Sequence, residues 1–254
     1  MDTKKEQGIV SIVVPVYNAQ QYIEKTIQMV QTQTYDSWEL YLVDDCSKDQ
    51  SVEIIKKYLS DERIHLICQE KNKGAAVARN IGIEQMQGDY LAFLDADDVW
   101  KPDKLEKQLQ FMKEKKAHFV YSGYEFGDEQ ANPTGKVVHV KEQLTYREAL
   151  SRTIIFTSTV LLDMHHFSKE DVKMPLCKSE DTATWWKILK KQEVAYGLDQ
   201  VLVIYRRPQK SLSSNKVEAV KRIWALYRKQ ELLSVEKSAY YFIGWALRAT
   251  LRRL

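Results

Sequence analysis

The sequence has little cysteine and no long apolar run, and each shortage excludes a class of protein. Its three cysteines, at positions 46, 68 and 177 of 254 residues, are widely spaced and odd in number. They predict reduced cytosolic thiols, neither a disulfide framework nor a zinc site. No stretch has the roughly 18 consecutive apolar residues of a membrane span, and residues 1–8 lack the apolar core of a signal peptide. We therefore expect a cytoplasmic protein with one large domain.

Positive charge is concentrated near the end of the chain. Residues 216–254 hold nine Lys or Arg and three Glu, a formal charge of +6, so the rest of the chain carries −3. A basic segment on a mildly acidic body favours contact with an anionic surface. The body shows no recognised nucleic-acid-binding module, so the charge favours a membrane surface and no nucleic acid.

Strand and helix patterns alternate along the first hundred residues. Four apolar runs are typical of strands buried on both faces. They cover residues 9–16, 40–43, 64–67 and 90–94. The helical segments between them have cap candidates in Asn18 and in Ser47 or Asp49. The alternation predicts an α/β fold with a doubly wound, mostly parallel, Rossmann-like sheet and helices on both faces.

An acidic turn follows the fourth of these runs. Asp95, Asp97 and Asp98 crowd three carboxylates at a predicted strand end, and such groups resist ionisation unless a cation shares the site. A hard divalent ion, Mn2+ or Mg2+, suits oxygen ligands of this kind. The alternative is an ordinary acidic turn in which Asp98 caps a helix beginning near Pro102.

Other polar residues follow the first two predicted strands. Tyr17 comes after the first, and Asp44 and Asp45 end the second. In doubly wound sheets, ligands bind beyond the carboxyl ends of the strands, near the point where strand order reverses. The chain has neither a GxGxxG motif after its first strand nor a Walker A loop. A nucleotide held by an aromatic ring, an aspartate and a metal ion remains compatible with these residues.

The second half of the chain is less regular, as expected where a sheet is adapted to a second substrate. The patterns predict a helix at 102–116, a strand at 118–121, a hairpin or loop at 125–140, a helix capped by Thr145, and a strand at 201–205. Arg206 and Arg207 follow that strand. They are candidates for binding phosphate or acceptor, although both can equally face solvent.

Ser179, Glu180 and Asp181 precede a segment with two tryptophans, at 185 and 186. One interpretation is a capping box with an acidic first turn of a helix. Another is a general base that the tryptophans shield from water, with Trp185 offering a surface to a sugar.

The order of these motifs resembles that of family 2 glycosyltransferases of the GT-A fold, and in particular the teichuronic-acid and capsular polysaccharide enzymes of Gram-positive bacteria. The similarity covers residues 9–207. It is carried by Pro-Val-Tyr-Asn at 15–18, Val-Asp-Asp-Cys-Ser at 43–47, Gly-Ala-Ala-Val-Ala-Arg-Asn at 74–80, Leu-Asp-Ala-Asp-Asp at 94–98 and Glu-Asp at 180–181.

The resemblance implies roles for individual residues. Pro15, Tyr17, Asp44, Asp45 and Arg79 would belong to the donor site, around the nucleobase and ribose. Asp95 and Asp97 would match the DXD motif that holds the metal and donor diphosphate, with Asp97 nearest the metal. Asp181 would match the catalytic base, with Glu180 beside it.

The same resemblance implies inverting, metal-dependent transfer from a nucleotide sugar, by family habit a UDP-sugar, to a hydroxyl of a lipid-linked or polysaccharide acceptor. The QxxRW motif of processive synthases is absent, which favours the transfer of one sugar. A nucleotidyltransferase and a catalytically silent nucleotide-sugar-binding protein are the alternatives.

The predicted layout is a tail at 1–8, a catalytic domain at 9–215 and a basic amphipathic helical extension at 216–254. Within the domain, residues 9–100 form the nucleotide-sugar-binding half and 101–215 the acceptor-binding half. The first helix of the extension is expected to pack on the domain or on a second subunit in a homo-oligomer. Residues 237–254 combine Trp and Tyr with Arg, which suits an anionic membrane surface. We therefore predict a peripheral protein on the inner face of the cell membrane.

Overall fold

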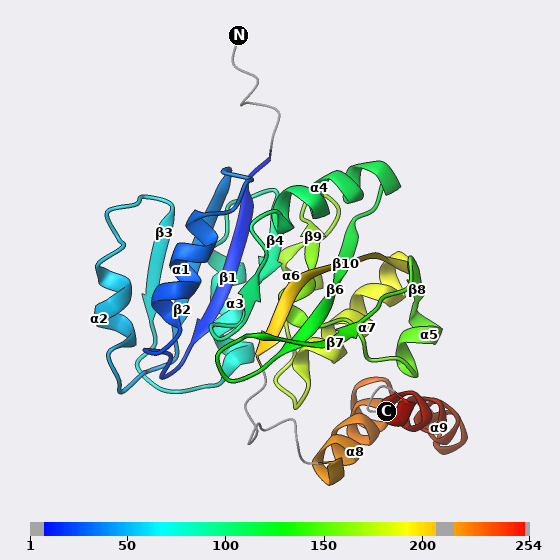
Figure 1. Ribbon diagram of the computed structural model, residues 1–254. Helices are drawn as coiled ribbons and strands as arrows, with labels where there is room; N and C mark the ends of the chain where they lie inside the picture. Colours follow the sequence, from blue (N-terminus) through cyan, green and yellow to red (C-terminus); the bar gives the residue numbers. More distant parts are fainter. Residues whose placement is uncertain (1–7, 207–215, 252–254) are drawn as a thin grey trace.

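The computed structural model describes residues 8–206 and 216–251 (Figure 1). The strands are β1 (Val10–Val16), β2 (Trp38–Asp44), β3 (Ile64–Cys68), β4 (Tyr90–Phe93), β5 (Val99–Trp100), β6 (Phe119–Gly127), β7 (Pro133–Val138), β8 (Gln143–Thr145), β9 (Leu161–Asp163) and β10 (Val194–Arg206). The helices are α1 (Ile23–Gln31), α2 (Ser51–Lys56), α3 (Ala75–Gln85), α4 (Lys104–Lys115), α5 (Tyr146–Leu150), α6 (Lys169–Val172), α7 (Glu180–Gln192), α8 (Lys216–Ala225) and α9 (Val235–Leu251). A 3-10 turn, η2, covers Thr157–Thr159, and a π-helical turn, η4, covers Leu226–Gln230.

The strands form one sheet in the order β3-β2-β1-β4-β9-β6-β10-β5, with β7 beside β6 and β8 beside β10. Strands β3, β2, β1 and β4 are parallel, β9 is antiparallel to β4 and β6, and β10 is parallel to β6. The predicted doubly wound, mostly parallel sheet is confirmed. Strand order reverses between β1 and β4, so their carboxyl ends flank the crevice where such sheets bind ligands.

Helices cover both faces of the sheet, and alternating residues of β1 show why. Ile12 and Val14 pack in the core shared with α1, α2 and α4, whereas Val13 packs in the core shared with α3, α6 and α7. A Cβ atom on Gly82 of α3 would lie 2.4 Å from Val13 Cγ1. Glycine therefore lets α3 pack closely against β1, which brings the start of α3 near the crevice.

Several local predictions are confirmed. Thr145 caps α5, and it forms a capping box with Glu148. Strands β6 and β7 form the expected antiparallel hairpin. Neither candidate cap of α2, Ser47 or Asp49, occupies the N-cap position, which is Gln50 and has no side-chain cap; Asp49 Oδ1 instead accepts a hydrogen bond of 2.9 Å from the backbone N–H of Ser51, the first residue of α2.

Two predicted helix caps are wrong, because both residues adopt left-handed backbone angles. Asn18 has φ +50°, and its Oδ1 accepts a hydrogen bond of 2.8 Å from Lys48 N, while α1 begins at Ile23 without a side-chain cap. Ser179 has φ +60° and no capping hydrogen bond to α7. Asn18 instead joins the two loops that follow β1 and β2.

The two predicted helices of the extension are present as α8 and α9, joined through η4. Ile223 and Tyr227 are buried in the core beside α7, where Tyr227 stacks on Trp186 with ring centroids 5.4 Å apart. In α9, Trp245 donates a hydrogen bond of 3.1 Å to Thr153 Oγ1. Both helices therefore pack on the domain, and Figure 1 shows them (orange and red) below α5 and α7. None of the helices described is long and apolar enough to cross a membrane.

Candidate active site

The first part of the site is an unsatisfied acceptor at the end of β2. Asp44 is 3% exposed, and its Oδ2 accepts a hydrogen bond of 3.1 Å from Ser47 N. Its Oδ1 is buried and has no partner among the described residues. A buried carboxylate oxygen without a donor is costly, so this atom is suited to accept an N–H or O–H from a ligand. Tyr17, 52% exposed, and the half-buried Pro15 lie at the end of the neighbouring β1.

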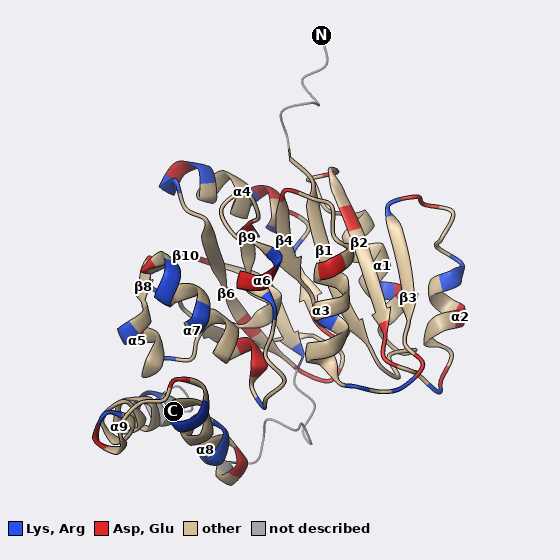
Figure 2. Cartoon of the chain, turned by 180° about the vertical axis from the view of Figure 1, so that it is seen from behind, with Lys and Arg blue, Asp and Glu red and all other residues tan. Residues whose placement is uncertain are grey.

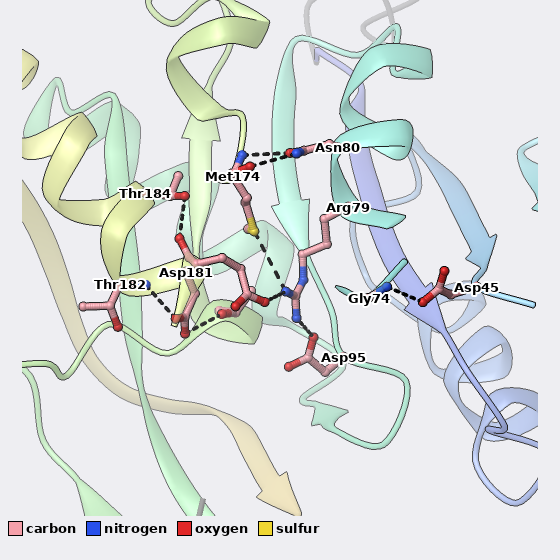
Figure 3. A network of polar contacts seen from close by, with 11 residues as sticks. Asp45, Gly74, Arg79, Asn80, Asp95, Met174, Asp181, Thr182 and Thr184 are labelled. Atoms are coloured by element: carbon pink, nitrogen blue, oxygen red, sulfur yellow. Dashed lines mark hydrogen bonds and ion pairs between the residues drawn. The ribbon is translucent and has the colours of Figure 1, made fainter. Parts of the chain in front are cut away.

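Asp45 has a different role from the predicted one, because both of its oxygens are used inside the protein. Oδ1 accepts hydrogen bonds from Gln69 Nε2 (2.9 Å) and Lys73 N (2.8 Å), and Oδ2 accepts one from Gly74 N (2.7 Å). Gly74, at φ +89°, precedes the first residue of α3. We therefore assign Asp45 to holding the start of α3 in place (Figure 3).

Asp98 is an anchor of the acidic turn and does not cap α4, which begins at Lys104. Its side chain accepts hydrogen bonds from Ser158 Oγ (2.5 Å) and Arg206 N (3.3 Å). Burial raises the pKa of Asp98 well above its ordinary value, and the charges of Asp95 and Asp97 raise it further. The turn is thus anchored by a buried carboxyl group whose pKa is raised.

The carboxylate of Asp97 is not held by another described side chain. Burial raises the pKa of Asp97, and the charge of Asp95 adds to the effect. No described residue donates a hydrogen bond to its carboxylate apart from its own backbone N–H. Within residues 8–206 and 216–251, no group of three or more His, Cys, Asp or Glu is arranged to hold a metal ion. The residues present fit a divalent cation only if a bound diphosphate supplies further oxygen ligands.

Arg79 of α3 connects the acidic turn to α7, whereas we had expected it near the nucleobase. It donates hydrogen bonds to Asp95 Oδ1 (2.5 Å) and Glu180 Oε1 (3.0 Å) (Figure 3). Burial alone would lower the pKa of Arg79, but the charges of Asp95 and Glu180 outweigh it and raise this pKa. The next residue, Asn80, bonds the backbone of Met174 through its Nδ2 (2.8 Å) and Oδ1 (2.7 Å). Arg79 is therefore a fixed cation between two sets of carboxylates.

Asp181 lies in the first turn of α7. Its Oδ2 accepts a hydrogen bond of 3.2 Å from Thr157 Oγ1, and its Oδ1 accepts one of 2.6 Å from Thr182 N. Burial raises the pKa of the adjacent Glu180; Arg79 opposes this shift and Asp181 adds to it. Two donors thus keep Asp181 oriented as an acceptor, while Glu180 is held by Arg79.

Two other predicted contacts are not surfaces for a substrate. Trp185 is 2% exposed and packs between Phe93 and Phe119, with ring centroids 5.9 and 5.7 Å away, so it cannot support an acceptor sugar. Arg206 is 9% exposed and donates to the carbonyl oxygens of Asp97 and Glu129, both at 2.7 Å. Its guanidinium therefore holds the acidic turn. Arg207 lies outside the described residues.

Sequence reasoning missed Thr157 and Ser158 of η2, whose hydroxyl groups contact the site. Ser158 Oγ, besides bonding Asp98, accepts a hydrogen bond of 3.1 Å from Asp95 N, and Thr157 bonds Asp181. The only signal was the hydroxyl run Thr-Ser-Thr at 157–159, more than 50 residues from the acidic turn. Nothing local indicates that η2 packs against β4 and β6.

Together, an α/β sheet, an unsatisfied aspartate, an acidic turn and a second carboxylate pair at one edge define a GT-A-type protein. Residues 11–165 match the family described as Glycosyl transferase family 2. The chain belongs to this family and is a glycosyltransferase, as the sequence motifs predicted.

Two relatives extend the match to nearly the whole chain. "Putative teichuronic acid biosynthesis glycosyltransferase TuaG" of Bacillus subtilis is 44% identical, over 97% of this chain and 98% of its own. "UDP-Glc:alpha-D-GlcNAc-diphosphoundecaprenol beta-1,3-glucosyltransferase WfgD" of Escherichia coli is 37% identical, over 85% of this chain and 84% of its own. By their names, both relatives are glycosyltransferases, in agreement with the family match.

Solved structures show the same fold at low identity. S. aureus TarS in complex with UDP-GlcNAc matches with a TM-score of 0.70 and 20% identity, over 93% of this chain and 71% of that one. The mannosyltransferase PcManGT from Pyrobaculum calidifontis, in complex with GDP-Man and Mn2+, matches with a TM-score of 0.69 and 15% identity, over 95% of this chain and 74% of that one.

Proposed function

We propose that this glycosyltransferase moves one sugar from a UDP-sugar to a hydroxyl group of a lipid-linked glycan acceptor, with inversion at the anomeric carbon. The observation that carries the proposal is the chain of charges from Asp95 through Arg79 to Glu180, because it fixes the acidic turn and Asp181 relative to each other. The UDP-sugar is supported by the names of WfgD and of the TarS complex, and the lipid-linked acceptor by the name of WfgD.

Each residue has a part in one displacement step. Asp44 Oδ1 accepts a hydrogen bond from the uracil or the ribose. Asp181 accepts the proton of the acceptor hydroxyl. At the same time, the oxygen of that hydroxyl forms a bond to the anomeric carbon. The bond from that carbon to the diphosphate breaks, and its electron pair leaves with UDP. Attack from the face opposite the leaving group inverts the anomeric centre, and its transition state has oxocarbenium character.

Asp97, with Asp95 beside it, would hold Mn2+ or Mg2+ against the donor diphosphate. Such an ion supplies neutralisation of the negative charge that develops on the leaving group. The Asp95 carboxylate is already paired with Arg79, so Asp97 would be the main ligand of the ion. General-base assistance contributes about 100- to 10,000-fold, so positioning by Arg79 and the rigid turn must supply much of the remaining acceleration.

A thermal-shift screen of nucleotide sugars, with and without Mn2+, tests the donor. A ligand that binds the native state raises its apparent stability by mass action. We expect UDP-sugars to raise the melting temperature more with Mn2+ than with EDTA, and UDP to be released on incubation. Equal shifts with GDP- or dTDP-sugars, or no metal dependence, would contradict the assignment.

We also propose that the extension contacts an anionic membrane surface, where a lipid-linked acceptor resides. The aromatic face with Tyr241, Phe242 and Trp245 is not free for this contact, because it packs on the domain core. The opposite face of α9 exposes Tyr240 (74%), Ile243 (59%) and Leu247 (62%). Apolar residues at this spacing form one stripe along the helix, and basic residues of the extension complement anionic lipids.

Liposome flotation tests this contact. We expect the triple replacement of Tyr240, Ile243 and Leu247 by Ser to release the protein from vesicles that contain anionic lipid, with UDP release unchanged. Leu59→Ser, an exposed apolar residue after α2, is the control and should float as the wild type does. Unchanged flotation of the triple variant would refute the contact.

A further inference from the structure

A basic pocket of about 400 Å³ lies between α8 and the loop that joins α6 to α7. Its charged lining residues are Lys178, Glu218, Lys221, Arg222 and Lys229. Glu218 pairs with Lys178 at 3.3 Å and with Lys221 at 3.6 Å. Four cations thus face one carboxylate, and positive charge is in excess. We call this cavity the α8 pocket.

The excess charge has no partner within the part of the chain described. Neither Arg222 nor Lys229 makes an ion pair or a side-chain hydrogen bond within residues 8–206 and 216–251, and neither is needed by the core, which α8 meets through Ile223. Cations gathered in one cavity repel one another, so an anion bound there would be favoured. A guanidinium with nearby ammonium groups is suited to phosphate oxygens.

Some exposed apolar side chains are neighbours in the chain of residues that line the α8 pocket. Leu176, next to the pocket residue Cys177, is 77% exposed. In α8, Val217 (62% exposed) and Val220 (41%) directly precede the pocket residues Glu218 and Lys221, whereas Trp224 packs against Phe242 of α9, with ring centroids 5.9 Å apart. Cations in a pocket with exposed apolar residues next to them in the chain suit an amphiphile that carries phosphate on a hydrocarbon chain, more than a small hydrophilic anion.

The α8 pocket is also close to the catalytic carboxylates. Cys177 lines it, and this residue lies three positions before Glu180 in the chain. Burial raises the pKa of the Cys177 thiol, and the charges of Glu180 and Asp181 raise it further. Figure 2 shows Lys and Arg positions along α8, which lies below α7 in this view.

We propose that the α8 pocket binds the phosphate groups of the lipid-linked acceptor, with the start of the hydrocarbon chain on the exposed apolar residues of α8 and on Leu176. This rests on the proposed function, because the bound phosphate places the adjoining sugar beside Asp181. The pocket then selects acceptors by their phosphate, independently of the donor site.

Binding of farnesyl diphosphate tests the proposal, with farnesol and inorganic pyrophosphate as comparisons. The full chain is titrated in EDTA with saturating UDP, so that the donor site does not bind the diphosphate. We expect Arg222→Gln with Lys229→Gln to weaken farnesyl diphosphate binding about tenfold or more. The matched control is Lys57→Gln with Lys113→Gln, which removes the same charge from two exposed positions. Lys57 directly follows α2 and Lys113 lies on α4. This variant should bind farnesyl diphosphate as the wild type does.

The comparison ligands and variants show which outcome would overturn each part of the proposal. Binding of pyrophosphate as tight as that of farnesyl diphosphate would overturn the lipid assignment in favour of a free anion. An equal loss in both double variants, or none in either, would overturn the pocket. UDP release from UDP-sugar without acceptor is measured in parallel. If the wild type releases no UDP, the proposed function is refuted. If Arg222→Gln/Lys229→Gln releases UDP normally and binds farnesyl diphosphate as the wild type does, only the α8 pocket is refuted.

Discussion

Replacing Arg79 by Met should destabilise the protein strongly at neutral pH and less in acid. The side chains of Arg79, Asp95 and Glu180 are 7%, 26% and 21% exposed. Removing the shared cation leaves two carboxylates in a poorly solvated place, and breaking a buried pair of this kind costs about 3–5 kcal/mol of unfolding free energy. Met fills similar space, so lost packing contributes little.

The pH dependence follows from Glu180. Its pKa is already raised by burial, and Arg79 is the main influence that lowers it. In the variant this influence is gone, so the folded-state pKa of Glu180 moves further above its unfolded value. The folded state then binds the proton more tightly than the unfolded state does, and stability is regained as the pH falls through that pKa. The deficit should therefore shrink between about pH 8 and about pH 5.

Urea unfolding followed by tryptophan fluorescence at several pH values measures this deficit. Lys56→Met is the control, because it breaks an exposed pair with Glu53, and such pairs contribute little. We expect no measurable change for Lys56→Met. A loss below about 1 kcal/mol for Arg79→Met at pH 8, or a loss that grows in acid, would refute the role of Arg79 as a buried counter-charge.

Three further substitutions separate the roles within the site. Asp97→Asn should nearly abolish transfer and Mn2+-dependent donor binding without unfolding the protein; retained Mn2+ dependence in thermal shift would show that the ligand is another residue. Asp181→Asn should lower kcat by about 100-fold or more with the donor Kd unchanged, since a base acts mainly in the transition state. A parallel fall in donor affinity would instead assign Asp181 to the donor site. Asp44→Ala should weaken UDP binding about tenfold in calorimetry, and unchanged affinity would remove Asp44 from the nucleotide site.

Much of the fold was predictable from local pattern. Apolar runs rich in β-branched or aromatic residues, such as Val10–Val16 and Trp38–Asp44, are typical of buried strands whatever they pack against, so their strand character does not depend on the partner. Alternation of strands with helices then permits few topologies besides a parallel sheet with right-handed crossover connections. The caps at Asn18 and Ser179 were not predictable, because tertiary contacts impose left-handed backbone angles that local propensity disfavours.

The candidate site divides in the same way. The sequence by itself determined which carboxylates lie at strand ends, Asp44 and Asp95 among them, since order along the chain places them at one edge of a parallel sheet. Only the tertiary structure decided how they are used. Asp45 is held by Gln69 and by two backbone donors at the start of α3, Trp185 is buried in the core, and Arg79 bonds Glu180, 101 residues away. The physical reason is that burial and hydrogen-bond partners depend on packing between segments far apart in the chain, which no local pattern encodes.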